Sequence, residues 1–189
     1  MRTVVCVGAG PSLDKEQADA IGELWVNGAI VIAVNRAYEM VPLCNIVYVA
    51  DGKACEAWAL DIRKATADSA IIFTTSNYRD AVRLIGGNGP GLNLSPGVVN
   101  YGGSGGYQAI NLAYHLGAEK IILAGYDYQH TDGKTHFHGD HPEGWANFGS
   151  PEERGGSFHR LAEDLWWRGV EVINCSKATS LTCFKRGTL

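Results

Sequence analysis

The chain has 189 residues, of which 46% are hydrophobic and 19% charged, and its net charge is −4 at pH 7. This length fits one domain with a sizeable core, and no apolar run approaches the roughly 20 residues of a membrane-spanning helix. The slightly acidic balance lacks the basic patch typical of nucleic-acid-binding proteins. Five scattered cysteines without a CxxC pair favour reduced thiols in the cytoplasm.

Short runs rich in valine and isoleucine alternate with longer stretches of helical pattern. The runs are apolar almost throughout, which is typical of strands buried on both faces of a parallel sheet. The expected strands cover residues 3–7, 29–34, 46–50, 70–74, 120–124 and 170–174. The expected helices cover residues 14–25, 53–65, 104–116 and 152–167. This alternation predicts a Rossmann-like α/β fold, a doubly wound, mainly parallel sheet with helices on both faces, as a single domain over residues 1–189.

Two irregular stretches interrupt the pattern. Residues 86–106 are rich in glycine, asparagine and proline, and residues 129–150 are rich in glycine and histidine. Long loops in compact domains are commonly functional, and both stretches should flank the carboxyl edge of the sheet, where α/β proteins bind ligands. We expect residues 129–150 to form a lid loop that closes over bound substrate.

The last expected helix ends in two adjacent tryptophans, Trp166 and Trp167. Aromatic side chains contribute large apolar areas to protein cores. We therefore expect this pair to pack on the sheet and not to stack on a ligand.

The first candidate motif, residues 8–12 (GAGPS), directly follows the first expected strand. Glycines there permit a sharp turn and close approach of a ligand, and backbone N–H groups at a helix start stabilise phosphate. The motif departs from the dinucleotide fingerprint, because Leu13 replaces the third glycine and Asn35-Arg36 replace the acidic residue after the second strand. Two interpretations stay open: a phosphate-binding variant of the turn, or a tight turn without a ligand.

A second glycine-rich segment, residues 102–106 (GGSGG), precedes the third expected helix. Glycine does not stabilise a helix start, so close approach of a ligand is one explanation, and Ser104 as a simple helix cap is the other. Asp127 follows the strand at 120–124 and should either face the ligand cleft or cap a turn.

Four of the six histidines fall within twelve residues of the expected lid loop: His130, His136, His138 and His141. The spacing of two between His136 and His138 could place both rings on one side of an extended segment. Such a cluster could bind Zn²⁺, Ni²⁺ or Mn²⁺, bind substrate and supply a general base near neutral pH, or form a solvated loop. It matches no recognised zinc motif, so a metal role is left open.

Four segments in register carry a resemblance to two related families. They are residues 7–13 (VGAGPSL), 33–38 (AVNRAY), 104–121 and 123–127 (LAGYD). Together they resemble the glycosyltransferase family 42 sialyltransferases and the 6-hydroxymethylpterin pyrophosphokinase-like family, over about residues 3–128. The chain also resembles small proteins of tailed phages and prophages that share a similar GYD…HGDHP stretch.

The resemblance implies a nucleotide at the carboxyl edge of the sheet. The residues that it implies at the nucleotide are Gly8, Gly10, Pro11, Ser12, Asn35, Ser104 and Gly105. Asp127 would line the transfer site, and Asp51, which follows the third strand, should lie at the same edge. Ala9 stands where the sialyltransferases have asparagine, and no histidine here has the spacing of their catalytic one, so sialic acid is not the expected donor.

We expect a nucleotide-dependent group transferase, most simply a glycosyltransferase-like enzyme with a nucleotide-sugar donor and a hydroxyl acceptor. A histidine among His136, His138 and His141 would accept the acceptor's proton. One alternative is an ATP-dependent pyrophosphokinase acting on a small, pterin-like alcohol, with Mg²⁺ bound by Asp51 and Asp127. Another is a phage protein that binds a nucleotide or metabolite without converting it. No other cofactor is expected, and self-association is left open.

Overall fold

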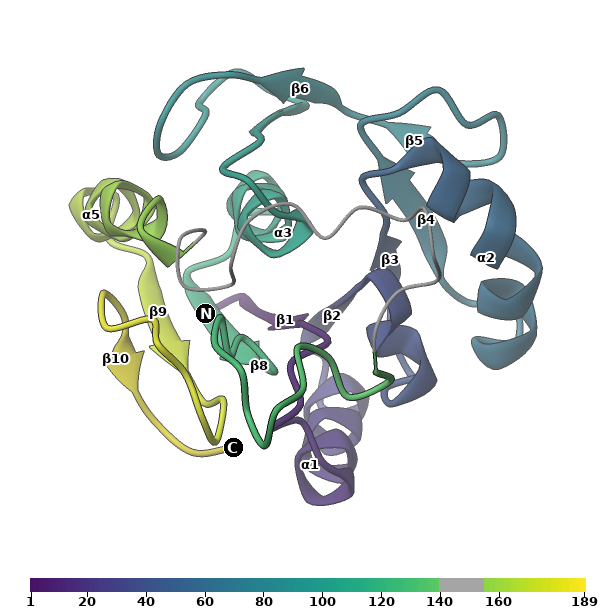
Figure 1. Cartoon of the computed structure of the whole chain (residues 1–189). Helices are drawn as coiled ribbons and strands as arrows, with labels where there is room; N and C mark the ends of the chain where they lie inside the picture. Colours follow the sequence, from purple (N-terminus) through teal and green to yellow (C-terminus); the bar gives the residue numbers. More distant parts are fainter. Residues whose placement is uncertain (140–154) are drawn as a thin grey trace.

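An eight-stranded parallel sheet organises the computed structural model, which describes residues 1–139 and 155–189 (Figure 1). Its spatial order is β10-β9-β8-β1-β2-β3-β4-β5, and every neighbouring pair is parallel. The strands are β1 (Thr3–Val7), β2 (Ile30–Val34), β3 (Ile46–Tyr48), β4 (Ile71–Thr74), β5 (Val82–Arg83), β8 (Lys120–Ala124), β9 (Glu171–Asn174) and β10 (Lys185–Arg186). The expected parallel sheet is confirmed.

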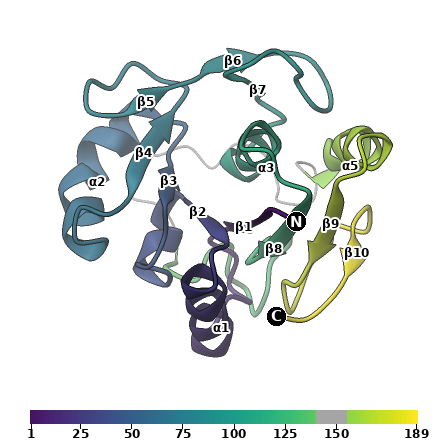
Figure 2. The same ribbon diagram turned by 180° about the vertical axis from the view of Figure 1, so that it is seen from behind.

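Helices cover both faces of this sheet, as predicted. The described helices are α1 (Lys15–Val26), α2 (Gly52–Ala65), α3 (Gly105–His115) and α5 (Phe158–Trp167), with the 3-10 helix η1 (Asn35–Glu39) after β2. Figures 1 and 2 show α3 and α5 on one face and α1 and α2 on the other. Val4 and Cys6 of β1 belong to the core beneath α3, whereas Val5 and Val7 belong to the core beneath α1. Burial on both faces explains why the strands lack polar alternation.

A small second sheet lies within the stretch predicted to be irregular. Its strands are β6 (Ile85–Gly87) and β7 (Val98–Asn100), which pair in parallel. Asparagine side chains hold the loop between them. Asn111 Oδ1 accepts from the backbone N–H of Asn93 (3.0 Å), and the side-chain amide of Asn93 donates to Asn100 Oδ1 (2.9 Å). These hydrogen bonds, together with the burial of Val99 and Leu92 in the core, stabilise the region, and the expectation of irregular structure over 86–106 was wrong at both strands.

The tryptophan pair is not packed on the sheet, which corrects the prediction for α5. Trp166 and Trp167 expose 68% and 73% of their surface. The helix buries Phe158, Leu161 and Leu165, which lie on one face at spacings of three and four residues. Trp166 and Trp167 come after these residues in the helix and lie off the buried face, so both are exposed. Within the described residues the helix begins at Phe158, and residues 152–154 of the predicted range lie outside them.

No helix in the described residues is long and apolar enough to cross a membrane.

Candidate functional site

The order of the strands reverses at β1, in the middle of the sheet. From β1 the chain proceeds outward through β2, β3 and β4, and it later returns to add β8 on the other side of β1. This reversal makes β1 the switch point of the sheet, and the segments that leave the ends of β1 and β8 pack against each other there. Open α/β sheets bind their ligands at such a switch point. The predicted site residues after β1, β2, β3 and β8, and at the start of α3, all belong to this edge.

The first glycine-rich turn is packed tightly against the segment that follows β8. The N–H of Gly8 donates to the carbonyl of Ala124 (2.8 Å), and that of Gly10 donates to the carbonyl of Gly125 (2.9 Å). A Cβ on Gly10 would overlap Asp127 Oδ1 and lie 2.6 Å from the Gly125 oxygen. The close approach that requires glycine here is thus made by the chain itself.

Asp127 is the carboxylate that holds this turn. It is 2% exposed and accepts hydrogen bonds from the Ser12 N–H (2.9 Å), the Ser12 hydroxyl (2.6 Å) and the Thr131 hydroxyl (3.1 Å). Its backbone carbonyl accepts from the Ser180 N–H (2.8 Å). Burial raises the pKa of Asp127, and the hydrogen bonds from Ser12 and Thr131 oppose that rise. The geometry matches the interpretation of Asp127 as a turn-capping residue, and its catalytic role stays a prediction.

Replacing Asp127 with asparagine should lower the free energy of unfolding by about 1–3 kcal/mol, because one carboxylate oxygen that accepts a hydrogen bond becomes an N–H₂ donor facing a donor. Urea denaturation measures this loss. Asp132→Asn is the matched control, since Asp132 is an exposed residue of the same loop, and it should leave stability within about 0.5 kcal/mol. Equal stability of the Asp127→Asn variant and the wild type would contradict the structural role.

Asn35 occupies the carboxyl end of β2 in a strained backbone conformation. Its φ is +54°, in the left-handed region that asparagine tolerates better than most residues. Its side chain faces the start of α3, since a Cβ on Gly105 would lie 3.9 Å from both Asn35 Oδ1 and Nδ2. Among the residues that the structure describes, no hydrogen bond engages this amide. Strain of this kind persists at functional sites.

The start of α3 offers backbone donors beside Asn35. Ser104 caps the helix by accepting from the Tyr107 N–H (3.2 Å), and its hydroxyl lies 2.6 Å from the Tyr128 hydroxyl. Across residues 1–139 and 155–189, no acceptor is bonded to the N–H groups of Gly105 and Gly106. A Cβ on Gly106 would lie 2.6 Å from the Tyr128 hydroxyl, so internal packing explains part of the glycine pattern.

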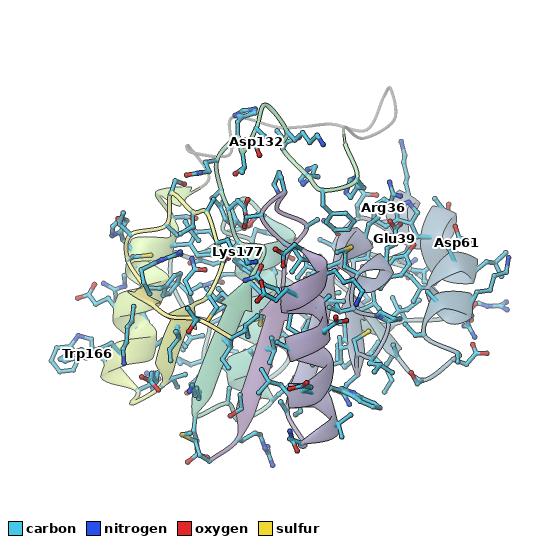
Figure 3. The ribbon with its side chains drawn as sticks, turned by 90° about the horizontal axis from the view of Figure 1, so that it is seen from below. Arg36, Glu39, Asp61, Asp132, Trp166 and Lys177 are labelled. Carbon is cyan, nitrogen blue, oxygen red and sulfur yellow. The ribbon has the colours of Figure 1, made fainter. Side chains whose placement is uncertain are left out.

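The starts of α1 and α2 carry carboxylates instead. Asp14 caps α1, Glu16 lies in its first turn, and Lys177 forms ion pairs with both; Figure 3 shows Lys177 beside that helix. Asp51 caps α2 by accepting from the N–H groups of Lys53 (2.7 Å) and Ala54 (3.2 Å) and is exposed. Negative charge at a helix start disfavours a second anion there.

A cation lies next to Asn35. The Nε of Arg36 is 2.6 Å from Glu39 Oε1, and both side chains are about one third exposed (Figure 3). A second hydrogen bond joins Arg36 Nη2 to Glu39 Oε2 (3.1 Å), so the pair is bidentate and Glu39 offsets part of the positive charge.

The histidine segment contacts the first turn, which the sequence did not reveal. The Phe137 N–H donates to the carbonyl of Ala9 (3.0 Å), and the flanking His136 and His138 rings stack with centroids 5.1 Å apart and planes at 18°. The expectation that both rings lie on one side is confirmed.

His130 is exposed, and His141 and the rest of the expected lid from residue 140 lie outside the described residues. Within the described part of the chain, no three metal-ligating side chains form a group.

A buried tyrosine beneath the start of α3 had no signal in the sequence. The Tyr48 hydroxyl at the end of β3 donates to Gln108 Oε1 (2.6 Å), and the Gln108 amide donates to the Tyr101 carbonyl (3.4 Å). Burial raises the pKa of Tyr48, so its hydroxyl stays protonated and acts as a donor. This pair fixes the start of α3 against β3.

A family model described as 6-hydroxymethylpterin diphosphokinase MptE-like matches residues 1–133, which include β1 through β8 and every predicted nucleotide-binding residue. No curated protein and no solved structure matches the chain.

Proposed function

The chain belongs to the 6-hydroxymethylpterin diphosphokinase MptE-like family, and from that premise we propose that it transfers a diphosphoryl group from ATP to the hydroxyl of a pterin-like alcohol. The family match favours this hypothesis over glycosyl transfer, which the two families' shared motifs had also allowed. The observation that carries the proposal is an anion-binding corner between the end of β2 and the start of α3.

The corner combines three groups that bind phosphate. Gly105 and Gly106 present backbone N–H groups at a helix start whose first turn contains no acidic residue. Asn35 adds a side-chain amide, and its chain neighbour Arg36 would add a guanidinium by exchanging its pairing with Glu39 for a phosphate. Backbone donors at a helix start, an amide and a guanidinium together stabilise the charge of a polyphosphate. The starts of α1 and α2, with their acidic caps, are poorer sites for it.

In the proposed reaction the acceptor hydroxyl oxygen forms a bond to the β-phosphorus of ATP. The bond from that phosphorus to the oxygen that bridges it to the α-phosphorus breaks, and AMP leaves with the electron pair. The hydroxyl proton passes to the imidazole of His136 or His138, which the Phe137–Ala9 hydrogen bond holds beside the first turn.

The two predicted Mg²⁺ ligands differ in their fit. Asp127 does not fit, because it is buried and its oxygens accept three hydrogen bonds from the protein. Asp51 fits, because it is exposed at the same edge and only its Oδ1 is used by the helix cap. Mg²⁺ is commonly held by one or two carboxylates together with substrate phosphates, whose charge it neutralises.

A thermal-shift screen tests the choice of donor. ATP with Mg²⁺ at 100 times its Kd should stabilise the protein by about 2.7 kcal/mol. CMP, UDP and GDP sugars at equal concentration should have a smaller effect, and EDTA should reduce the shift with ATP. Stabilisation by a nucleotide sugar without stabilisation by ATP would instead support glycosyl transfer.

A further inference from the structure

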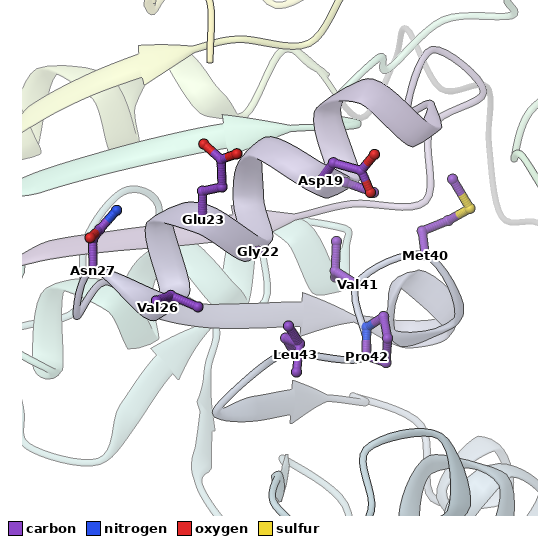
Figure 4. A pocket seen from close by; sticks show the side chains of 10 residues that line it. Asp19, Gly22, Glu23, Val26, Asn27, Met40, Val41, Pro42 and Leu43 are labelled. Carbon is purple, nitrogen blue, oxygen red and sulfur yellow. The ribbon is translucent and has the colours of Figure 1, made fainter.

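An apolar groove with an acidic rim runs along the outer side of α1 (Figure 4). It has a volume of about 500 Å³ and lies between α1 and the loop that follows η1. Gly22 forms the floor, since a Cβ there would have Leu43 Cδ1 as its one neighbour, at 3.9 Å. Val26 and Leu43 line the groove and are 71% and 47% exposed. A groove of this size has room for bulky aromatic side chains.

The rim of the groove carries negative charge. Asp19 and Glu23 lie one turn apart on α1, and both line the groove. Asp19 pairs with Lys15, whereas no ion pair engages Glu23 in the described part of the chain. A cationic group of an occupant would therefore find an open carboxylate.

The same chain carries a surface of complementary chemistry at the end of α5. Trp166 and Trp167 pack edge to face with ring centroids 4.8 Å apart, and Figure 3 shows Trp166 projecting from the edge of the molecule. Exposed tryptophans of this kind are rare away from interfaces, where tryptophan and arginine are the commonest anchors. Arg168 follows directly, is exposed, and has no ion-pair partner within residues 1–139 and 155–189.

We propose that the chain associates head to tail with a second copy of itself, with Trp166 and Trp167 of one copy seated in the groove along α1 of the next and Arg168 paired with Glu23. The tryptophans cover the apolar floor of the groove at Gly22, and the guanidinium of Arg168 pairs with the carboxylate of Glu23 on the rim.

The positions of the two surfaces decide the type of contact. The helix α5 belongs to the core on one face of the sheet, and α1 belongs to the core on the other. One copy therefore cannot fill its own groove, and each copy in an assembly offers a tryptophan pair at one end and a groove at the other. Such a heterologous contact produces a closed ring of copies when the rotation between neighbours closes, and an open filament when it does not.

The contact is small, so the association is weak. Two tryptophans bury about 150–250 Å² each, below the roughly 800 Å² per partner of a standard stable interface. The average mass measured by analytical ultracentrifugation should therefore rise between about 10 and 300 µM protein, as expected for a transient contact. A mass that stays monomeric over this range would overturn the proposal.

Two variants each remove one half of the contact. The double replacement Trp166→Ser and Trp167→Ser removes the aromatic pair, and Gly22→Leu fills the groove. Each variant should be monomeric when alone. Gly22→Ala, which leaves the groove open, and Leu60→Ser, which removes an exposed side chain on α2, are matched controls and should associate like the wild type.

The decisive experiment mixes the two monomeric variants and tests whether their intact halves bind each other. The tryptophan-free copy retains a groove and the Gly22→Leu copy retains a tryptophan pair, so the mixture should form a one-to-one dimer. Absence of that dimer overturns the proposal, and so does a Gly22→Leu variant that still associates, because tryptophans of two copies would then stack on each other. Glu23→Lys and Arg168→Glu should each weaken association and restore it when combined in one chain.

Discussion

Replacing Gly10 with alanine should destabilise the protein by about 3 kcal/mol or more, one of the largest effects of a single methyl group in this chain. The new Cβ would overlap Asp127 Oδ1 and lie 2.6 Å from the carbonyl oxygen of Gly125. That oxygen is part of the backbone and is held by the Gly10 N–H, so neither neighbour can move without breaking the turn. Urea denaturation of the purified variant measures the loss.

Gly22→Ala is the control for this measurement. A Cβ at Gly22 meets Leu43 at an ordinary contact distance of 3.9 Å, and alanine in a helix is more favourable than glycine by about 0.5–1 kcal/mol. The control should therefore be slightly more stable than the wild type. A Gly10→Ala variant that unfolds at the same urea concentration as the wild type would contradict the packing of the turn against β8.

Replacing Asn35 with glycine should weaken ATP binding by about 10–100-fold, because the hydrogen bonds of the amide to a charged phosphate are lost. The fold should be unaffected or slightly more stable, since glycine adopts the φ of +54° without strain. Asn35→Ala should weaken binding equally but destabilise the fold by about 1–2 kcal/mol, since alanine at positive φ is strained. Calorimetric titration with ATP and urea denaturation separate the two effects.

The pair of variants distinguishes a ligand contact from a structural role. If Asn35→Gly binds ATP as tightly as the wild type, the amide does not contact the nucleotide, and the anion-binding corner is wrong. If the affinity of both variants for ATP falls only as far as their free energy of unfolding falls, the role of Asn35 is to shape the turn and not to contact the nucleotide.

The strands of the central sheet could be predicted because their signal is local. Val4 and Val5 are both apolar since both faces of β1 are covered, and this run of buried residues is visible in the sequence. The predicted ends of the other long strands and helices differ from the structure by at most two residues, whereas α5 begins at Phe158 and the predicted helix began at residue 152, which lies outside the described residues. The two-residue strands β5 and β10 carry no such run, and their pairing depends on neighbours that are distant in sequence.

The site was harder to predict than the sheet, since its contacts join distant segments. The hydrogen bonds from Ser12 to Asp127 span 115 residues, and no local pattern assigns one to the other. The Trp166–Trp167 error had a different origin. The spacing of Phe158, Leu161 and Leu165 already defines the buried face of α5, and the tryptophans lie off it. The helical periodicity therefore already predicts that the tryptophans are exposed. The prediction of burial followed the general preference of aromatic residues for the core instead.

The most direct test of the proposed reaction follows the phosphorus atoms of ATP. The full chain is incubated with Mg²⁺, a 6-hydroxymethylpterin and ATP labelled in its β-phosphate, and the products are separated and quantified. Diphosphoryl transfer predicts that the label moves to the pterin while unlabelled AMP forms in equal amount. Labelled ADP, or ATP that binds but is not converted, would contradict the proposed function.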